Sequence, residues 1–551
     1  MTILTLNKKE LEKKVGKIDS KMEELITMMG TPIEEIKEAE ISIEVFPNRP
    51  DLLSLQNFAR ALNQYIGKEK VADFKINKPE KDFVVTIDKS VKKIRPYTVC
   101  AIVKNLNFDD EKIKEIVDIQ EKLHNSIGRN RKKVAIGVYP LEKIKLPIKF
   151  IAKKPEEIKF VPLDSPKEMN GRQILRNHPT GRDYAHLLKN AEVFPIFVDS
   201  NNKILSMPPI INSEETGRIT KNTKEIFIEC SGHNLFYLKK CLNILISALY
   251  DMGGKIYSME IKDSKEGNFI SPDMSYEEKE FDIKNIEKTL GINLTEKDIR
   301  IYLEKMGIKY TKKKDKSFAL IPPYRMDILH WIDLSEEVAI AYGYQNFKPE
   351  IPKISTIGEE DSFEKKKKVI SNILVGLGIL ETSTFHLTTK KNIKKIHYEF
   401  NNFIEVEDSK TERNVLRIDL LTNQLQIFSE NSDSLYPQKI FEIGRVFEKN
   451  EKSDTGTKEN NHLAISIIDE EVRFTDLKQI LDYLFKMIDK SYEIKETNNN
   501  NYIEGRVGEI IFDGKSMGYI GEIAPRVLKN WKIKTPVISL EINIDLLISQ
   551  L

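Results

Sequence analysis

The sequence predicts an α+β protein made of several domains. Its 551 residues are too many for a single hydrophobic core, and typical domain sizes suggest about four of them. Segments with the alternation of a strand and segments with helical periodicity follow one another along the chain. Hydrophobic residues make up 40% and charged residues 31%, which is the composition of an ordinary soluble globular protein.

Charge, cysteines and apolar runs exclude several classes of protein. The 87 basic and 85 acidic residues leave a net charge of +2, so a polyanionic partner has to be held by local patches. No run of about 18 apolar residues occurs, which excludes a membrane span, and the first residues lack the features of a secretory signal. Three cysteines without metal-ligand spacing predict a reduced, cytoplasmic chain, and the 8 histidines form no zinc pattern.

Residues 1–80 are predicted to form an N-terminal α/β module. The stretches 6–16 and 19–30 have the pattern of two short amphipathic helices, each ended by a glycine. A strand then leads through a proline-bounded turn into a third helix. Asp51 is its expected N-cap, because a carboxylate there can accept hydrogen bonds from free amides. The apolar face of this helix is expected to contain Leu52, Leu55, Phe58, Ala59 and Leu62.

Residues 81–267 are predicted to form one mixed α+β domain. The stretches 109–128 and 238–254 have the apolar periodicity of helices. Strands are predicted at residues 83–88, 97–106, 134–139, 194–199 and 226–232.

Residues 268–346 are predicted to form a small unit with the order strand, helix, turn, helix, strand. Thr295 followed by Asp298 has the pattern of a capping box at its second helix. Residues 347–551 again mix helix and strand, and the hydrophilic stretches 448–461 and 496–501 are expected to be surface loops.

Four acidic residues surround an otherwise apolar segment between Tyr324 and Tyr344. Two prolines keep the approach extended, so Asp327 is expected at the end of a strand or in the following loop. A helix that begins near residue 330 places the other three acids, Asp333, Glu336 and Glu337, on one face.

Two interpretations account for these acids. Acids in the first turn of a helix are favoured by its macrodipole, by about 0.3–1 kcal/mol each. Three acids on one face, with no Lys or Arg between Met326 and Phe347, instead repel one another by about 0.2–0.5 kcal/mol per pair. A divalent cation would remove that repulsion, and Mg²⁺, which takes few carboxylates and keeps several waters, suits such a set.

The segment Ser206–Asn212, with the sequence SMPPIIN, is predicted to be stiff and extended, because two prolines fix φ and remove two donors. It is either a rigid turn between strands or a support that holds Asn212, Ser213 and Glu214 in defined positions.

A basic run, GRNRKK, begins at Gly128. It is either a solvated surface segment or a grip on nucleic-acid phosphates by Arg129, Arg131, Lys132 and Lys133.

Several of these motifs together resemble one family. IPPYRMDILHWIDLSEEVAIAYGYQNFKP is similar to the metal-bearing module of phenylalanine–tRNA ligase beta subunits, whose pattern is R-x-D followed by D-L-x-E-[ED] and G-Y. EVFPNRPDLLSLQNFARAL resembles the family's N-terminal signature. GRNRKKVAIGVYPLEKIKLPIKF, LSMPPIINSEETGRIT and IFIECSGHN resemble the middle domain of its archaeal and eukaryotic branch, and VLRIDLLTNQL and KIFEIGRVFE resemble its C-terminal module. The resemblance extends over nearly the full chain.

The resemblance implies a site in two of the modules. It assigns the magnesium ligands of a small winged-helix-like module to Asp327, Asp333, Glu336 and Glu337. It makes the middle domain an editing domain that hydrolyses tyrosine wrongly attached to tRNA-Phe, a reaction that needs an oriented water and donors for an oxyanion. There, Asn212 and Ser213 are expected to orient the water or the ester, and Glu214 to act as base or to bind the tyrosine hydroxyl. Arg129, Arg131, Lys132 and Lys133 are expected to hold the tRNA acceptor end.

The resemblance also implies that residues 347–551 form an antiparallel-sheet core of the class II synthetase type that lacks catalytic motifs. LRID (residues 416–419) and GYIGEIAPR (residues 518–526) are loosely similar to two class II motifs, but the first lacks the expected glutamate and the second has only two glycines. In the family, ATP and phenylalanine are bound by the alpha subunit, which packs against the beta subunit in an α2β2 heterotetramer. The stretch 363–380 resembles part of that interface.

Two alternatives stay open. A free-standing deacylase would clear mischarged tRNA without a partner, although a synthetase-like module and a shared metal have little use in a monomer. A nucleic-acid-binding scaffold is suggested by the helix-turn-helix order of residues 268–345, but near-neutral net charge and a recognition helix loaded with acids disfavour it.

Overall fold

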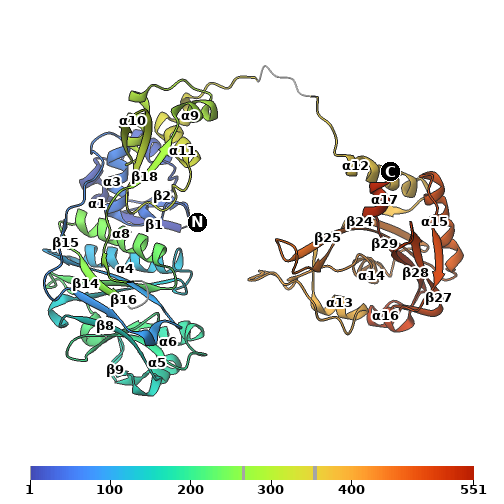
Figure 1. Cartoon of the computed structure of the whole chain (residues 1–551), viewed down its shortest axis with the longest axis horizontal. Coiled ribbons are helices and arrows are strands. Elements are labelled where there is room, and N and C mark those ends of the chain that lie inside the picture. Colours follow the sequence, from blue (N-terminus) through green and yellow to red (C-terminus); the bar gives the residue numbers. More distant parts are fainter. Residues whose placement is uncertain (1, 264–266, 352–356) are drawn as a thin grey trace. The chain divides into compact units, whose positions relative to one another are not determined.

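The computed structural model describes residues 2–263, 267–351 and 357–551, and the chain divides into two compact units, Met1–Glu350 and Ile351–Leu551 (Figure 1). Both units mix helices and sheets, as the sequence predicts. Within these described ranges, no helix combines the length and the apolar character that crossing a bilayer requires.

The N-terminal part of the first unit is a three-stranded antiparallel sheet with three helices. The sheet order is β1-β3-β2. Gly16 ends α1 and Gly30 follows α2, with φ of 94° and 90°, a region that glycine adopts without strain. The predicted apolar face of α3 is buried. The elements are β1 (Thr2–Asn7), α1 (Lys8–Val15), α2 (Ser20–Met28), β2 (Ile33–Ile36), β3 (Glu40–Val45) and α3 (Leu55–Tyr65).

Asp51 is not the N-cap of α3, so that prediction is wrong. The helix begins later, and the amide of Asn57 donates to the hydroxyl of Ser54 at 3.2 Å. Asp51 lies in the preceding 3-10 turn, where its carboxylate accepts hydrogen bonds from Nε and Nη2 of Arg49 at 3.0 and 2.9 Å. An arginine two residues earlier in the chain therefore uses the group that was expected to cap the helix.

Two sheets and two long helices form the middle of the first unit. A five-stranded sheet has the order β4-β15-β6-β14-β7, and a seven-stranded sheet has the order β13-β12-β11-β8-β5-β16-β17. Helices α4 (Asp110–Asn125) and α8 (Leu235–Asp251) lie along the five-stranded sheet, and α8 also packs on α3, so the N-terminal part shares its core with the middle part (Figure 1).

The strands of the two sheets are β4 (Ile76–Asn77), β5 (Val84–Ile87), β6 (Tyr97–Lys104), β7 (Val134–Pro140), β8 (Ile148–Lys153), β11 (Phe194–Val198), β12 (Ile204–Met207), β13 (Ile211–Asn212), β14 (Ile226–Gly232), β15 (Lys255–Tyr257), β16 (Met259–Asp263) and β17 (Phe269–Ser271). Smaller elements are β9 (Lys159–Phe160), β10 (Met169–Asn170), α5 (Gly171–Asn177), α6 (Pro179–Tyr184) and α7 (Glu214–Gly217).

The last part of the first unit has the predicted order of strand, helix, turn, helix and strand. The capping box forms, with the Asp298 amide donating to Thr295 Oγ1 at 3.2 Å and the Thr295 amide donating to Asp298 Oδ2 at 2.9 Å. The helix expected near residue 330 begins directly after its N-cap, His330. The elements are β18 (Glu277–Phe281), α9 (Ile283–Leu290), α10 (Glu296–Lys305), β19 (Lys309–Lys313), β20 (Lys316–Ile321) and α11 (Trp331–Tyr342).

The second unit is built around a seven-stranded sheet of order β21-β24-β25-β29-β28-β27-β26, antiparallel except for the short β21. Side chains of α12 and α15 pack into one hydrophobic cluster with the sheet, and those of α14 and α16 pack into another. The helices are α12 (Ser362–Gly376), α13 (Lys390–Ile396), α14 (Leu421–Glu430), α15 (Phe474–Met487), α16 (Pro525–Asn530) and α17 (Asp545–Ser549). The strands are β21 (Leu380–Glu381), β22 (Leu387–Thr388), β23 (Val415–Leu416), β24 (Gln438–Lys449), β25 (Thr457–Ile468), β26 (Glu493–Glu496), β27 (Tyr502–Phe512), β28 (Lys515–Ile523) and β29 (Val537–Asn543).

Only half of the stretch 448–461 is a loop, which corrects the sequence-based expectation. Strands β24 and β25 pair in register as far as Lys449 and Thr457, so only residues 450–456 connect them. Alternating charged residues on an exposed hairpin have the composition of a loop, and composition alone does not separate the two.

Candidate functional site

A cavity of about 390 Å³ lies beside the SMPPIIN segment. Helix α4, strand β7 and strand β14 supply much of the rest of its wall, and Asp164, His178 and Arg218 also line it. Of the three residues expected to form a site there, Asn212 lines the cavity, whereas Ser213 and Glu214 are not among its lining residues. The stiff segment therefore does border a pocket, but it brings only one of the expected side chains to it.

A buried carboxyl group lines the same cavity. Glu229 lies on β14 and is 2% exposed. The hydroxyl of Tyr139 donates to its Oε1 at 3.3 Å, while Oε2 has no hydrogen-bond partner among the described residues. Burial raises the pKa of Glu229 to about 8, although the positive charge of Arg95 opposes the shift. At neutral pH this carboxyl is mostly protonated, so it can donate a hydrogen bond as well as accept one.

Tyr139 connects Glu229 to Asn212. The Tyr139 hydroxyl also lies 3.3 Å from Asn212 Oδ1, so its one proton serves either neighbour. Gly137 on the same strand leaves room for this arrangement. A Cβ at Gly137 would lie 2.2 Å from the Tyr139 hydroxyl and 2.6 Å from Glu229 Oε1, closer than any real contact allows. The glycine is thus a requirement of the polar cluster.

Glu214 faces a different partner. Arg218 donates to Glu214 Oε1 at 2.8 Å and to Oε2 at 2.9 Å, and the backbone amide of Asp164 donates to Oε2. The hydrogen bonds from Arg218, and then that from Asp164, lower the pKa of Glu214. Its carboxylate is a weak base for that reason, and it is already engaged in an ion pair. Ser213 is buried, and its amide donates to Leu205.

The basic run is divided between the surface and the cavity. Arg129 and Lys132 are exposed, whereas Lys133 lies 5.3 Å from the centre of the Tyr237 ring. Arg131 points inward, donating to Glu121 on α4 at 2.7 Å and to the carbonyl of Ile210 at 2.9 Å. Arg131 therefore fixes the SMPPIIN segment against the helix.

The acid cluster is organised by an arginine. Arg325 is 1% exposed and donates to both oxygens of Asp327 at 2.8 and 2.7 Å. It also donates to both oxygens of Glu337, at 3.0 and 2.7 Å. Glu337 is itself buried, with 4% exposure. Two of the four acids thus balance one internal positive charge, and each pair has the two-point geometry that makes such contacts strong.

The other two acids lie apart from that pair. Asp333 Oδ2 accepts the amides of Leu329 and His330 at 2.7 Å each, which caps α11. Glu336 is exposed, and both Asp333 and Glu336 line a shallow hollow against α9. Asp333 therefore fulfils the helix-terminus role that the macrodipole interpretation requires.

The four carboxylates do not fit one shared metal site. Within the described residues, no group of three or more His, Cys, Asp or Glu side chains is placed to hold a metal ion. The repulsion that the sequence suggested is relieved by Arg325. Asp333 and Glu336 have no arginine or lysine partner in the described part of the chain, and Mg²⁺ needs only one or two carboxylates when it keeps its waters.

Glu229 and Tyr139 are functional candidates that the sequence did not single out. Glu229 is the one charged residue in the apolar stretch IFIECSG, and a lone charge in a buried strand is the signal that could have identified it. Tyr139 carries no such signal, because tyrosine is common in strands.

Comparison with known proteins gives matches along the whole chain. Residues 81–240 match the model described as B3/4 domain, residues 279–344 the tRNA synthetase B5 domain, and residues 348–544 the phenylalanyl tRNA synthetase beta chain CLM domain. The chain is 37% identical to the phenylalanine–tRNA ligase beta subunit of Pyrococcus abyssi over 547 residues, 98% of each protein. It is 34% identical to that of Archaeoglobus fulgidus over 553 residues, 99% of this chain and 98% of the relative. A solved N-terminal fragment of the Pyrococcus horikoshii beta subunit matches with a TM-score of 0.59 and 35% identity, covering 62% of this chain and 99% of the fragment.

Proposed function

Because the chain belongs to the family of phenylalanine–tRNA ligase beta subunits, we propose that it supports the ATP-dependent attachment of phenylalanine to tRNA-Phe by an alpha subunit. The family makes this chain one subunit of an aminoacyl-tRNA synthetase, a ligase of protein biosynthesis that implies an alpha partner and a tRNA. An α2β2 assembly in the cytoplasm is the form we propose for it.

The second part of the proposal is that the middle domain, residues 81–267, hydrolyses tyrosine wrongly attached to tRNA-Phe. The observation that carries it is Glu229, a buried, mostly protonated carboxyl that lines the cavity and has one oxygen without a hydrogen-bond partner among the described residues. A phenol hydroxyl both donates and accepts hydrogen bonds, as a neutral carboxyl does. Phenylalanine lacks that hydroxyl and would leave the carboxyl unpaired, which disfavours its binding.

The hydrolysis itself requires a water and a polarised ester. A water adds to the carbonyl carbon, the bond to the ribose oxygen breaks, and that oxygen takes up a proton. Asn212 lines the cavity and can orient the water or the ester through its amide. The role first given to Glu214 passes to Glu229, because Glu214 is bound to Arg218 and does not reach the cavity. Arg129 and Lys132 are the exposed cations that would meet the tRNA backbone, and Lys133 and Arg131 support them.

For magnesium, which the family generally uses together with ATP, we propose a reduced ligand set. Asp333 and Glu336 would hold the ion with water completing its shell, at the 268–346 module. Asp327 and Glu337 would remain with Arg325, because removing them would leave a buried cation unpaired. The ion would supply positive charge at a surface where a partner chain can contribute further ligands.

We assign residues 347–551 a structural role at the alpha subunit. The LRID motif lacks the glutamate expected of a class II core, and Nη1 of its Arg417 is bound to Glu442 at 2.6 Å, so we propose no ATP site there. ATP and phenylalanine would accordingly be bound mainly by the alpha subunit.

The test is deacylation of Tyr-tRNA-Phe by the purified alpha–beta complex. Asn212→Ala and Glu229→Gln should let Tyr-tRNA-Phe accumulate, while attachment of phenylalanine continues at its normal rate. Glu215→Gln is the matched control and should edit normally, because Glu215 is an exposed carboxylate of α7 that pairs with Lys203 and does not line the cavity. Loss of phenylalanine attachment with intact deacylation would refute the assignment of this domain. Size measurement of the co-expressed chains tests the partnership separately, since an active monomer would favour a free-standing deacylase.

A further inference from the structure

Three arginines in the chain stand two residues before an aspartate, and all three are largely buried. In two of them, Arg49–Asp51 and Arg325–Asp327, the arginine donates from Nε and Nη2 to its own aspartate. The third, Arg417–Asp419, has the same sequence pattern but not the same contact. This difference leaves Arg417 with an unusual set of partners.

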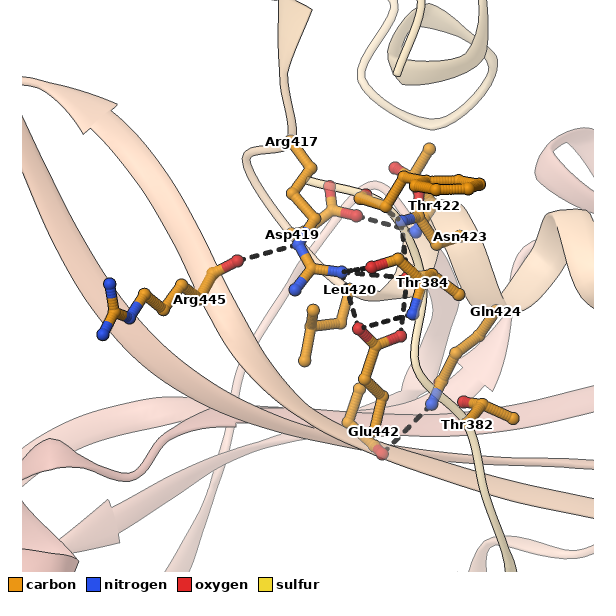
Figure 2. A network of polar contacts seen from close by, with 12 residues as sticks. Thr382, Thr384, Arg417, Asp419, Leu420, Thr422, Asn423, Gln424, Glu442 and Arg445 are labelled. Carbon is orange, nitrogen blue, oxygen red and sulfur yellow. Dashed lines mark hydrogen bonds and ion pairs between the residues drawn. The ribbon is translucent and has the colours of Figure 1, made fainter. Parts of the chain in front are cut away.

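Arg417 uses two of its three nitrogens. Nε donates to the carbonyl of Arg445 at 2.7 Å, and Nη1 donates to Thr384 Oγ1 at 2.9 Å and to Glu442 Oε1 at 2.6 Å. Figure 2 shows the guanidinium held between these groups, with one terminal nitrogen that carries no dashed line. That nitrogen is Nη2, which makes no hydrogen bond to any described residue. The side chain is 2% exposed, so the unused donors belong to a buried charge.

The conformation of Asp419 and the absence of a side chain at Gly444 explain why Nη2 of Arg417 has no partner among the described residues. Asp419 is turned to His397 Nε2, at 2.6 Å, and accepts the amide of Thr422 at 2.7 Å, so it does not reach back to Arg417. Gly444 on β24 lies beside Nη2, and a Cβ there would stand 2.3 Å from it. The glycine leaves the space next to the nitrogen open.

That space belongs to a cavity of about 510 Å³ over strand β24. Arg417, Arg445, Lys367, His386, Asn461 and Gly444 are among its lining residues. Arg445 is 61% exposed, and its ion-pair partner Glu459 is 52% exposed, a pairing that water screens and that contributes little. The same holds for Lys367, which lies 3.5 Å from Glu364. Both cations can turn toward a ligand at small cost.

Glu442, the carboxylate bound to Arg417, is already used, whereas Arg417 Nη2 is spare; Asp361 and Glu364 also line the cavity but accept no hydrogen bond from Nη2. Both oxygens of Glu442 accept hydrogen bonds from Thr384, and Oε1 accepts another from Arg417. Asp361 accepts amides at the start of α12. Burial and the nearby arginines lower the pKa of His386, so it adds no charge at neutral pH. What the site lacks is a negatively charged oxygen at Nη2.

We propose that this cavity of the second unit binds a small molecule through one oxyanion, a carboxylate or a phosphate, placed on Arg417 Nη2 and Arg445. Nothing in the proposed ligase or editing roles requires this site. The oxyanion supplies the acceptor that Asp51 and Asp327 provide to the other two arginines. Arg417 is the fixed donor, and Arg445 is the mobile one that closes on the ligand.

The test is calorimetric titration of the full chain with inorganic phosphate and, separately, with succinate, at constant ionic strength set with sodium chloride. At least one of the two should bind saturably, and which one binds identifies the oxyanion. Arg445→Gln should weaken binding at least fivefold, and Gly444→Ala at least tenfold, because its Cβ occupies the place of the ligand oxygen. Arg506→Gln is the matched control, since Arg506 is 59% exposed in an ion pair on another strand of the same sheet.

Absence of saturable binding by both anions would overturn the proposal. So would equal weakening by Arg445→Gln and Arg506→Gln, which would indicate general attraction of anions to the surface. Arg445→Gln changes an exposed side chain and leaves the Arg417 network in place, so its result stands even where Gly444→Ala fails to fold.

Discussion

Replacing Glu229 by glutamine should change how the stability of the middle domain depends on pH. The carboxyl is 2% exposed, and burial raises its pKa to about 8, whereas in the unfolded chain it titrates at its ordinary value of 4.5. Between these values the folded protein holds a proton that the unfolded chain has released. A raised carboxyl pKa therefore contributes stability at low pH that is lost as the pH rises.

The size of the effect follows from the two pKa values. Within that window one proton separates the folded and unfolded states, so the free energy of unfolding falls by about 1.4 kcal/mol per pH unit. From pH 4.5 to pH 8 the loss amounts to about 5 kcal/mol, as an order of magnitude. Glutamine cannot titrate, so the Glu229→Gln protein should not show this contribution, and its relative stability should rise with pH.

The assay is amide hydrogen exchange of β14 and β7 in the full chain at pH 5, 6, 7 and 8, corrected for the intrinsic exchange rate. It reports the opening free energy of this region without requiring the whole chain to unfold in one step. Glu225→Gln, a partly exposed residue just before β14, is the control and should keep the wild-type slope. A difference between wild type and Glu229→Gln that stays constant with pH would mean that Glu229 is ionised at neutral pH. The reading of a neutral carboxyl in the editing cavity would then fail.

Four further changes test the other parts of the structure. Glu337→Gln should destabilise the first unit by about 3–5 kcal/mol in denaturant titration, because the buried Arg325 loses the negative charge that balances its own. Glu336→Gln, at the exposed neighbouring position, should shift stability by less than about 0.5 kcal/mol. Asp333→Asn combined with Glu336→Gln should abolish the change in melting temperature that Mg²⁺ or a chelator produces in the wild type; an unchanged response would exclude that pair as ligands. Gly137→Ala should suppress deacylation of Tyr-tRNA-Phe while phenylalanine attachment persists, because its Cβ would lie 2.6 Å from Glu229 Oε1; normal editing by this variant would show that the cluster can relax. Ser54→Ala should cost about 1 kcal/mol through loss of the α3 cap, measured by thermal melting against the wild type.

Much of the secondary structure followed from local pattern. Helices α1, α2 and α8 begin and end close to where periodicity and glycines place them, and α11 begins where it was expected, because caps and apolar faces are properties of short segments. Strands β24 and β25 were missed at their outer ends, since their pairing depends on a partner strand and not on composition. Long-range pairing is the information that a local pattern does not carry.

The sites were predicted less well than the elements. The SMPPIIN segment was placed beside a cavity, but only Asn212 of its three expected residues reaches it. Glu214 is paired with Arg218, four residues later in the chain. Glu229, 15 residues after Glu214, lies on β14, which lines the cavity. Which polar groups share a cavity depends on how strands pack, and no spacing along the chain encodes that.

The acid cluster illustrates the same limit in electrostatic terms. No Lys or Arg lies between Met326 and Phe347, and this absence favoured a bound metal ion as the positive charge among the acids. The cation is Arg325, one residue before that interval, and its guanidinium reaches two acids twelve or fewer residues away. Arg49 of the N-terminal signature lies near enough to Arg325 and Glu337 for their charges to affect its pKa. Two motifs nearly 280 residues apart in sequence therefore lie close enough for their charges to interact. In two R-x-D motifs the aspartate accepts from its own arginine, which holds that arginine in the fold; where Asp419 turns to His397, Nη2 of Arg417 is left for the proposed ligand.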